Sequence, residues 1–511
     1  MKDFDLLFNR WLDKESKNLS RQDQGTEQTK AKRTYIHFDK RRQASSLHKY
    51  REFFRDTNKV VANAFWPFMH RSIKVLKIKN NKNGQRNKKV KERKVYYASH
   101  HDALIYSWYS FLLNEKYYQK ILKNLGIDEC VIAYRQIPVK FGSNKNKCNI
   151  HFAQEVFDYI RNKNKECVAF VSDITGFFDN LDHEHLKREW LRVLGLNKDE
   201  DLPDDHSIIY KNLTNFKYVD VEEVYKNFDI KFKRKFVVHN GRGKVFQVPV
   251  VNGKPIASIL DTPFSRKDFQ DKIVKNGLIK GNEYRNKAKK CVCGIMQGSP
   301  ISATLSNIYM LSFDKRINDL LSVKGGLYRR YSDDLVIVCN MEDYSEINQI
   351  VQNEIKKYEL EINDSKTDTT RFFLNGESRL KACAINSEIP KNMQYLGFEF
   401  NGRDIFIRSS SITKYYRKMK SVIRKTLSIA YGKKSKTKNT NNKVYKKSLY
   451  KRFLYKGQRS FISYAFRANN IIRGDVIKHQ LKNRFEILAK YFEKKQRART
   501  WIKNKQNPNK I

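Results

Sequence analysis

The chain has 511 residues, and its 103 Lys and Arg against 54 Asp and Glu give a formal charge of +49. Folding does not require this excess, and the ordinary reason to tolerate such self-repulsion is a polyanionic partner such as a nucleic acid. Aromatic residues make up 13% of the chain, which suits base stacking as well as core packing. The chain has no apolar stretch of about 20 residues and no signal-peptide pattern, so we expect a cytoplasmic protein without a membrane partner.

The N-terminal part is predicted to be helical and then strongly basic. Residues 1–70 show helical periodicity, with Phe8 and Trp11 on the apolar face, and predict a helical layer. Residues 71–94 crowd Lys and Arg around a polar turn, which predicts a basic hairpin or loop. Such an element either tracks phosphates or is a solvated, mobile surface loop. Residues 102–125 predict a further helix.

Arg135 is a candidate phosphate-binding residue. It follows the apolar pair Ile132-Ala133 and precedes a loop that contains Gly142. An arginine after a strand and beside a glycine-bearing loop suits a triphosphate or a template phosphate through bidentate contacts. An ordinary exposed surface arginine is the other interpretation. Residues 152–160 then predict a helix.

Asp173 is placed at the end of a predicted strand. An apolar run beginning at Val168 leads directly into this acid, and Gly176 then allows a tight turn before two phenylalanines. A capped strand-to-helix turn explains Asp179 and Asp182, because either can cap the helix that follows. It does not explain Asp173, which we interpret as a candidate metal ligand.

Other residues that resemble metal ligands do not form a convincing pattern. The seven cysteines are scattered and odd in number, and Cys291-Val292-Cys293 lacks the two-residue gap of a zinc knuckle. We therefore expect free thiols. His183 and His185 are two positions apart on a predicted helix and do not share a face.

Gln297 precedes an apolar helix predicted over residues 303–321. Together with the turn Gly298-Ser299-Pro300 it lies at the N-terminus of that helix. Free backbone N–H groups and the helix dipole favour anions there.

Asp333 and Asp334 lie between the aromatic-rich residues 327–331 and the apolar, largely β-branched run 335–339. This pattern predicts a β-hairpin with both acids at its turn. Two acids beside a buried strand are unfavourable unless a cation or hydrogen-bond donors compensate them. Mg²⁺ would do so, because it takes carboxylate oxygens and leaves positions for water and phosphates. An Asx-rich turn between core strands is the alternative.

The remaining elements are predicted from the same kinds of pattern. Residues 344–360 predict a helix, 361–367 a turn and 395–400 a short strand. Residues 409–503 predict basic helices, interrupted by a polar, low-complexity linker over 432–443.

The carboxylates and the motifs around them point to phosphoryl transfer. Asp173 at a strand end and Asp333-Asp334 at a hairpin turn are what a two-metal mechanism requires. The full set of motifs, in chain order, resembles the palm motifs of reverse transcriptases over about residues 130–405: Asp173-Ile174-Thr175-Gly176-Phe177-Phe178-Asp179, Gln297-Gly298-Ser299-Pro300, Tyr331-Ser332-Asp333-Asp334, the turn with Lys366, and Tyr395-Leu396-Gly397-Phe398.

The resemblance implies a metal site and a sugar-selecting residue. Asp173 and Asp333 would be metal ligands together with the carbonyl of Ile174, and Asp334 a supporting carboxylate. The implied cofactor is a pair of Mg²⁺ ions, although Mn²⁺ accepts the same oxygens. Phe178 would block a ribose 2′-hydroxyl and so select dNTPs, with core packing as its alternative.

The same resemblance implies nucleotide and primer contacts. Gln297 would contact the incoming nucleotide or the template, Arg135 the triphosphate, and Lys366 the pyrophosphate leaving group. Leu396 and Gly397 would belong to the primer grip.

The implied fold is α+β, a right-hand polymerase with an antiparallel palm sheet. Fingers and palm would occupy residues 126–405, with an insertion over about 197–290. An N-terminal helical and basic extension over 1–125 would precede them, and an α-helical basic thumb or C-terminal domain over 406–511 would follow.

Within the family the chain is most similar to bacterial reverse transcriptases of the abortive-infection or phage-defence type, and also to those of retrons and group II introns. The implied function is RNA-templated DNA synthesis from dNTPs to a cDNA product, with a dedicated non-coding RNA, in antiphage defence. Alternatives are a retron-like or group II intron-like enzyme, a template-independent, protein-primed or RNA-synthesising polymerase, and an inactive palm that binds RNA or a phage component. Template, primer and homo-oligomeric state stay open.

Overall fold

The computed structural model describes residues 2–23, 35–80, 86–163, 165–239, 242–260, 265–286, 290–363, 367–431, 444, 446–455 and 460–506. The chain divides into two compact units, each assembled from separate segments. Unit 1 comprises Met1–Tyr134, Ile174–Arg316 and Val351–Glu361, and unit 2 comprises Arg135–Asp173, Ile317–Ile350 and Ile362–Ile511. The domain boundaries expected from the sequence at residues 125 and 405 stay predictions.

The predicted N-terminal helical layer is confirmed. Helix α1 (Lys2–Asp23) buries Phe8 and Trp11 completely, as its periodicity indicates. The Trp11 indole N–H donates to Ser107 Oγ at 3.1 Å and so ties α1 to α4 (His100–Leu112). Short helices follow α1: η2 (Ala44–Lys49), α2 (Tyr50–Arg55) and α3 (Thr57–Val61).

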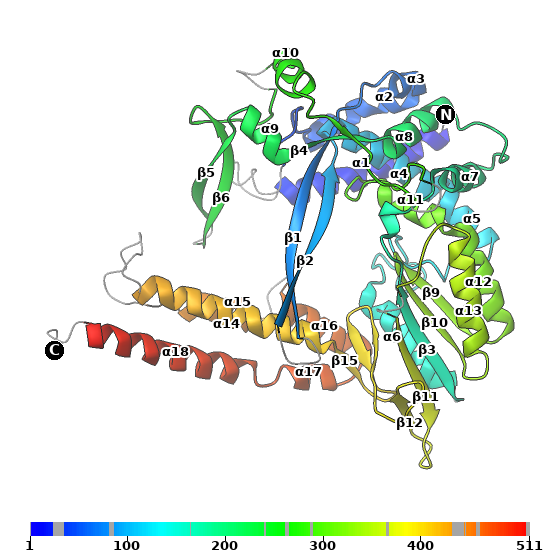
Figure 1. Ribbon diagram of the computed structural model, residues 1–511, viewed down its shortest axis with the longest axis vertical. Helices are drawn as coiled ribbons and strands as arrows, with labels where there is room; N and C mark the ends of the chain where they lie inside the picture. The colour runs from blue at the N-terminus through cyan, green and yellow to red at the C-terminus, as the bar shows by residue number, and fades with distance from the viewer. Residues whose placement is uncertain are drawn as a thin grey trace. The chain divides into compact units, whose positions relative to one another are not determined.

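A four-stranded sheet in unit 1 contains the predicted basic hairpin. Strands β1 (Phe68–Asn80) and β2 (Arg86–Tyr97) pair antiparallel, and the residues between them lie outside the described residues. The sheet order is β2-β1-β4-β8, with β4 (Lys217–Asp220) parallel to β1 and β8 (Lys280–Gly281) antiparallel to β4. Figure 1 shows β1 and β2 as a long ribbon that extends beyond the short β4.

The remaining elements of unit 1 are mostly short helices. The helix predicted over 102–125 is interrupted, because a π-helical turn separates α4 from α5. These elements are η3 (Leu113–Tyr118), α5 (Gln119–Asn124), η4 (Phe177–Asp179), α7 (His183–Leu194), α8 (Asp204–Thr214), α9 (Val221–Asn227), β5 (Lys231–His239), β6 (Arg242–Val251), β7 (Lys254–Pro255), α10 (Arg266–Phe269), η5 (Gln270–Val274) and α11 (Ser302–Tyr309).

The tract predicted as an insertion over residues 197–290 shares a hydrophobic core with the N-terminal part of the chain. Val219, Phe228 and Ile273 from this tract are buried in one cluster with Ile36 and Phe38 from the N-terminal part. The insertion is therefore packed into unit 1 rather than attached as an independent loop.

Unit 2 contains the predicted antiparallel palm sheet, with strand order β12-β11-β3-β10-β9 and antiparallel pairing throughout. Strand β3 is central and almost wholly buried, as its apolar sequence indicates. Strands β11 and β12 were not expected from the sequence. The bounds are β3 (Cys167–Asp173), β9 (Leu327–Tyr331), β10 (Asp334–Asn340), β11 (Asp368–Leu374) and β12 (Leu380–Cys383).

A second small sheet corrects the single strand predicted over residues 395–400. The chain forms two antiparallel strands there, β13 (Met393–Tyr395) and β14 (Phe398–Phe400), and β15 (Ile405–Ile407) adds to β14. The helices on either side of the β9–β10 hairpin also differ slightly from the prediction. The helix expected over 303–321 breaks at Met310 into α11 and α12 (Leu311–Val323), and the next helix, α13, is Tyr344–Lys356.

The C-terminal region is helical, as predicted, and the linker predicted over 432–443 lies outside the described residues. Helices α14 and α18 run side by side in Figure 1 and pack with α6, β3 and β13–β15 in one core. In the described part of the chain, no helix is both long and apolar enough to cross a membrane. The helices are α6 (Asn149–Lys163), α14 (Ser409–Tyr431), α15 (Lys446–Phe453), α16 (Phe461–Ile472), α17 (Val476–Gln480) and α18 (Arg484–Gln506).

Candidate active site

The pairing of β3 with β10 brings two of the predicted carboxylates together. Asp173 is the last residue of β3 and lies opposite Asp334, the first residue of β10. Directly opposed residues of an antiparallel pair project from the same face, with Cβ atoms about 4.5–5.5 Å apart. The strands therefore present both carboxyl groups at one edge of the palm sheet.

The β9–β10 turn places Asp333 beside Asp173. Its two loop residues are Ser332 and Asp333, so Asp334 belongs to the strand rather than to the turn as predicted. Ser332 has a φ of 63°, and its carbonyl accepts a hydrogen bond from the fully buried Arg330 at 3.2 Å. Burial raises the pKa of Asp333, and the adjacent carboxyl group of Asp173 raises it further. The turn thus holds two acids in mutual repulsion.

This pair of acids fits a divalent cation. A positive ion would stabilise the ionised form of Asp333, which burial and repulsion by Asp173 both disfavour. No three His, Cys, Asp or Glu side chains converge as a metal-ligand set within the described ranges. Asp173 and Asp333 would supply two protein oxygens, and water or phosphate the remaining positions, as Mg²⁺ commonly accepts. Ile174, the next residue after Asp173, is buried, and the role of its carbonyl stays a prediction.

Asp173 and Asp334 line a cavity of about 680 Å³ in unit 2, and Asp333 is not among its lining residues. Asp173 and Asp334 contribute one wall, and the predicted primer-grip residues Leu396 and Gly397 contribute another. The other lining residues are Asn149, Val171, Ser172, Tyr331, Asp368, Gln394, Tyr395 and Arg408. A volume of this size falls in the range of small-molecule and cofactor sites.

The turn between β13 and β14 has two residues with positive φ angles and is held by hydrogen bonds from two other segments. Leu396 and Gly397 have φ angles of 44° and 91°, so both adopt the left-handed conformations of a tight hairpin turn. Asn149 Nδ2 donates to the Leu396 carbonyl at 3.0 Å, and the Arg408 backbone N–H donates to the Gly397 carbonyl at 3.0 Å. Leucine is strained in this conformation. Strained residues of this kind are more common at functional sites than elsewhere.

Asn149, Tyr395 and Arg408 are among the cavity residues that the sequence did not identify. Asn149 and Arg408 are brought to the turn only by the tertiary fold. Tyr395 is 2% exposed, and its hydroxyl has no hydrogen-bond partner among the described residues. Burial and the negative charge of Asp334 raise the pKa of this hydroxyl. The only sequence indication was the position of Tyr395 beside Leu396 and Gly397.

Phe178 and Gln297 belong to unit 1, where two of the sequence motifs meet. The Phe178 carbonyl accepts from the Ile295 N–H at 2.8 Å, and the Gln297 carbonyl accepts from the Tyr96 N–H at 2.8 Å. Gly298 has a φ of 120°, and a Cβ there would lie 2.1 Å from the Tyr96 carbonyl oxygen. The loop of residues 294–298 is thus packed between η4 and the end of β2.

Another predicted site residue, Arg135, is not brought to the cavity. Arg135 lies in an irregular segment without the strand that the sequence suggested, and it does not line the cavity. The reason is that the exposed Tyr134 beside it adopts a positive φ of 61°, which ends any extended pairing there. Lys366 lies outside the described residues.

The two histidines of the His183-Glu184-His185 stretch are used structurally. The Nε2 atom of His183 lies 2.8 Å from the Gly294 carbonyl oxygen, and that of His185 lies 2.9 Å from the Tyr309 carbonyl oxygen. Asp182 caps α7 by accepting from the His185 N–H at 2.8 Å. The seven cysteines are free thiols.

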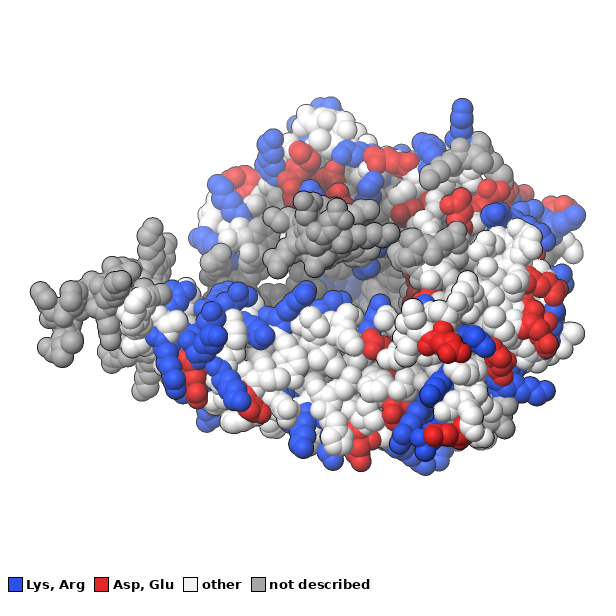
Figure 2. All heavy atoms as spheres, turned by 60° about the horizontal axis from the view of Figure 1, so that its bottom comes forward, with Lys and Arg blue, Asp and Glu red and all other residues white. Residues whose placement is uncertain are grey.

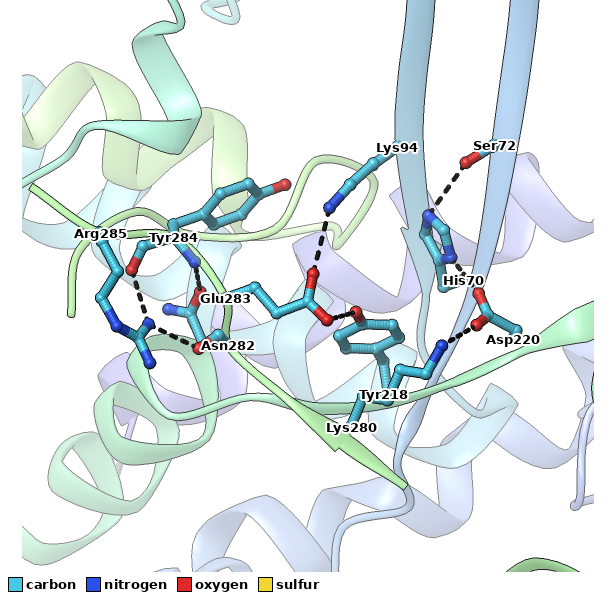
Figure 3. A network of polar contacts seen from close by, with 10 residues as sticks. All are labelled: His70, Ser72, Lys94, Tyr218, Asp220, Lys280, Asn282, Glu283, Tyr284 and Arg285. Carbon is cyan, nitrogen blue, oxygen red and sulfur yellow. Dashed lines mark hydrogen bonds and ion pairs between the residues drawn. The ribbon is translucent and has the colours of Figure 1, made fainter. Parts of the chain in front are cut away.

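A network around Asp220 holds the root of the β1–β2 hairpin (Figure 3). Asp220 Oδ1 lies 2.5 Å from His70 Nδ1 on β1, and Lys280 Nζ on β8 donates to Asp220 Oδ2 at 2.6 Å. Burial opposes ionisation of Asp220, but these two hydrogen bonds outweigh it and lower the pKa. One carboxylate thereby joins three strands.

Glu283 forms a second network at the same root (Figure 3). Its Oε1 accepts from the Tyr218 hydroxyl on β4 at 2.7 Å, and its Oε2 accepts from Lys94 Nζ on β2 at 3.3 Å. Both strands of the hairpin are therefore anchored to an acid of unit 1.

The antiparallel sheets and the helical C-terminal region are those of a right-hand polymerase with fingers, palm and thumb. Residues 256–400 match the family described as reverse transcriptase (RNA-dependent DNA polymerase). The match identifies a reverse transcriptase domain over these residues, and the predicted fold class is confirmed.

Solved telomerase structures are also similar, at low identity. The apo telomerase of Candida tropicalis truncated from its C-terminal domain is 12% identical, with a TM-score of 0.33, over 66% of this chain and 57% of that one. The Candida albicans telomerase in complex with a TWJ fragment of telomeric RNA is 10% identical, with a TM-score of 0.33, over 88% and 65%. The chain thus covers less than two thirds of each. No curated protein sequence matches the chain.

Proposed function

We propose that this chain extends a primer with dNTPs on an RNA template. The observation that carries the proposal is that Asp173 and Asp334 lie opposite each other at the edge of the palm sheet and line one cavity with the Leu396–Gly397 turn, while Asp333 lies beside Asp173. This is the arrangement that nucleotidyl transfer with carboxylate-held cations needs.

The carboxylates and the Leu396–Gly397 turn would have different roles. When bound, two divalent cations would activate the primer 3′-hydroxyl and neutralise charge on the transferring phosphoryl group. Asp173 and Asp333 would hold them with the Ile174 carbonyl, and Asp334 would add negative charge nearby. The turn of Leu396 and Gly397 would support the primer end.

Residues outside the cavity would contact the nucleotide and the template. Gln297 would contact the incoming nucleotide or the template base. Arg135 and Lys366 would neutralise the triphosphate and the leaving pyrophosphate, as cations at phosphoryl-transfer sites do. These three roles rest on the resemblance of the motifs.

The proposed biological setting is bacterial antiphage defence with a dedicated non-coding RNA. It rests on the similarity of the motif set to abortive-infection reverse transcriptases. Retron-like, group II intron-like and protein-primed enzymes share the same palm motifs and are the alternatives. A homo-oligomer is compatible with all of them.

The test is to purify the protein with its bound nucleic acid, sequence that RNA, and supply labelled dNTPs with Mg²⁺. A DNA product copied from one co-purifying RNA, and absent from Asp333→Ala, is the expected result. DNA made without any RNA complement would favour template-independent synthesis, and no product from either protein would contradict the proposal. Phage plaque counts with wild-type and Asp333→Ala cells test the defence role separately.

Phe178→Ala is expected to admit rNTPs. Removing the ring would open space beside the sugar, and discrimination set by one apolar side chain is worth about 10–200-fold. Competition between dCTP and rCTP in primer extension measures the change. Phe177→Ala is the matched control, because Phe177 is 3% exposed and packs in the core, so it should lower stability without altering sugar selection. Unchanged selectivity in Phe178→Ala would remove this assignment.

RNA binding is expected to weaken steeply with salt. Arg71, Lys74, Lys91 and Arg93 are exposed on the β1–β2 hairpin. If each neutralises one phosphate of a single strand, affinity falls about 50-fold between about 50 and 200 mM salt. Further Lys and Arg side chains lie over the C-terminal helices (Figure 2). The exposed ones on α14 are Lys414, Arg417, Lys418, Lys420, Arg424 and Lys425.

The hairpin contribution is isolated by paired variants. Lys74→Gln combined with Lys91→Gln should reduce the slope of log affinity against log salt, whereas Lys123→Gln on α5 should leave it unchanged. A salt-independent affinity of the wild-type protein would contradict phosphate tracking.

A further inference from the structure

Unit 1 contains a second cavity, of about 440 Å³, that shares no lining residue with the carboxylate cavity. Three segments enclose it: residues 64–68 between α3 and β1, the end of α8 with the residues that follow, and α10 with the start of η5. Its size is within the range of ligand sites in proteins.

One side of this cavity is aromatic and rigid. Phe65 is stacked on Tyr106 with ring centroids 5.5 Å apart, and Trp66 is stacked on Phe38 at 5.4 Å. Phe269 meets the Trp66 ring edge-on at 5.1 Å. Phe65 and Trp66 nevertheless remain partly exposed where they line the cavity. Rings fixed in this way are suited to stack on a planar ligand without loss of their own freedom.

The other side carries amides and cations. Asn215, Lys217, Arg266 and Gln270 are exposed lining residues, and none of their side chains has a hydrogen bond or an ion pair with another described residue. Asn212 uses its Nδ2 on the Ile208 carbonyl at 2.9 Å, which leaves its side-chain oxygen available. No Asp or Glu among the described residues lines the cavity.

We propose that this cavity binds one nucleotide unit, with the base against Phe65 and Trp66 and the phosphate between Lys217 and Arg266. Base stacking on aromatic side chains tolerates any base, and the amides offer both donors and acceptors to its edge. Arg266 can contact a phosphate with two parallel N–H groups. The nucleotide is either free or an unpaired residue of an RNA strand. The proposal does not depend on polymerase activity.

The first arm of the test uses the full chain without divalent ions and titrates AMP and UMP by calorimetry. Lys217→Ala combined with Arg266→Ala is expected to weaken binding at least tenfold. Lys267→Ala is the matched control, since Lys267 is an exposed neighbour that does not line the cavity. Asp333→Ala is expected to bind as the wild type does, which separates this site from the catalytic one. Circular dichroism melts verify that each variant is folded.

The second arm detects an RNA residue. A short single-stranded RNA containing 4-thiouridine is crosslinked by light, and the attached peptides are identified by mass spectrometry. Crosslinks on the peptide with Phe65 and Trp66 that disappear in the double variant, without binding of AMP or UMP, identify the RNA as the source. Binding of the free nucleotides that the double variant loses identifies a free-nucleotide site. If neither arm responds to the double variant, or if Lys267→Ala has the same effect, the proposal is overturned.

Discussion

Asp333→Asn is expected to slow nucleotide addition by about 10²–10³-fold and, at the same time, to stabilise the fold at neutral pH. The substitution removes a ligand for the cations on which charge neutralisation depends, and loss of one such electrostatic element typically costs about 10²–10³-fold in rate. It also removes an acid whose folded state is strained by burial and by Asp173. Function and stability therefore change in opposite directions.

The pH dependence follows from the direction of this shift. The pKa of Asp333 is raised in the folded protein above the ordinary value of 3.8, so the folded state holds its proton more tightly than the unfolded state does. Stability then falls as the pH rises through the interval between the two pKa values, and the loss is complete above the folded one. Asparagine does not ionise and avoids this loss.

Thermal melting across pH, together with primer extension, measures both effects. The Tm of Asp333→Asn should exceed that of the wild type at pH 7, and the difference should vanish at a pH below 3.8. Asp199→Asn, in an exposed loop, should change neither Tm nor activity. A lower Tm for Asp333→Asn at pH 7 would contradict the repulsion between the two acids.

Gly298→Ala is expected to be among the most destabilising single-methyl additions in the chain. The new Cβ would lie 2.1 Å from the Tyr96 carbonyl oxygen, and the φ of 120° is unfavourable for any side chain. Backbone strain and overpacking together predict a loss of about 2–5 kcal/mol. Because Gln297 is hydrogen-bonded to Tyr96 through its backbone, relief of the clash would also displace Gln297.

Gly277→Ala separates the two causes. Gly277 has a φ of 64°, but a Cβ at this position would meet no atom within 4 Å, so only conformational strain of about 1 kcal/mol applies there. Chemical denaturation of both variants gives the comparison. Equal losses of unfolding free energy in the two variants would show that the Tyr96 carbonyl moves away from the new Cβ without a measurable energetic penalty.

Local sequence patterns were sufficient to predict the two strands, β3 and β10, that carry Asp173 and Asp334. The apolar run before Asp173 and the β-branched run after Asp334 are each a continuous buried strand, and a strand of that kind is visible in the sequence. The partners of these strands could not be predicted in the same way. Strands β11 and β12 are mixed in composition, and they are defined mainly by pairing, β11 with β3 and β12 with β11.

The remaining errors have physical causes. Leu396 adopts a positive φ that leucine rarely takes, so a tight turn within 395–400 was not expected and a single strand was predicted. Asn149 and Arg408 reach the same turn from segments far apart in the chain, and no spacing in the sequence records such a contact. The second cavity was missed for the same reason, because its three walls come from residues 64–68, 212–217 and 266–279.

The networks at the root of the β1–β2 hairpin have a consequence for strand alignment. Apolar residues are exposed on both faces of this ribbon, with Ile73 and Val75 on one and Leu76 and Val90 on the other. A hydrophobic pattern of that kind does not distinguish one pairing register from the next. The pairs of His70 with Asp220 and of Lys94 with Glu283 do distinguish them, because a slip of one residue between the strands would separate one pair or the other. The two acids at the base of the ribbon, together with the buried side chains of Phe68, Met69 and Tyr96, therefore fix the pairing register of its two strands.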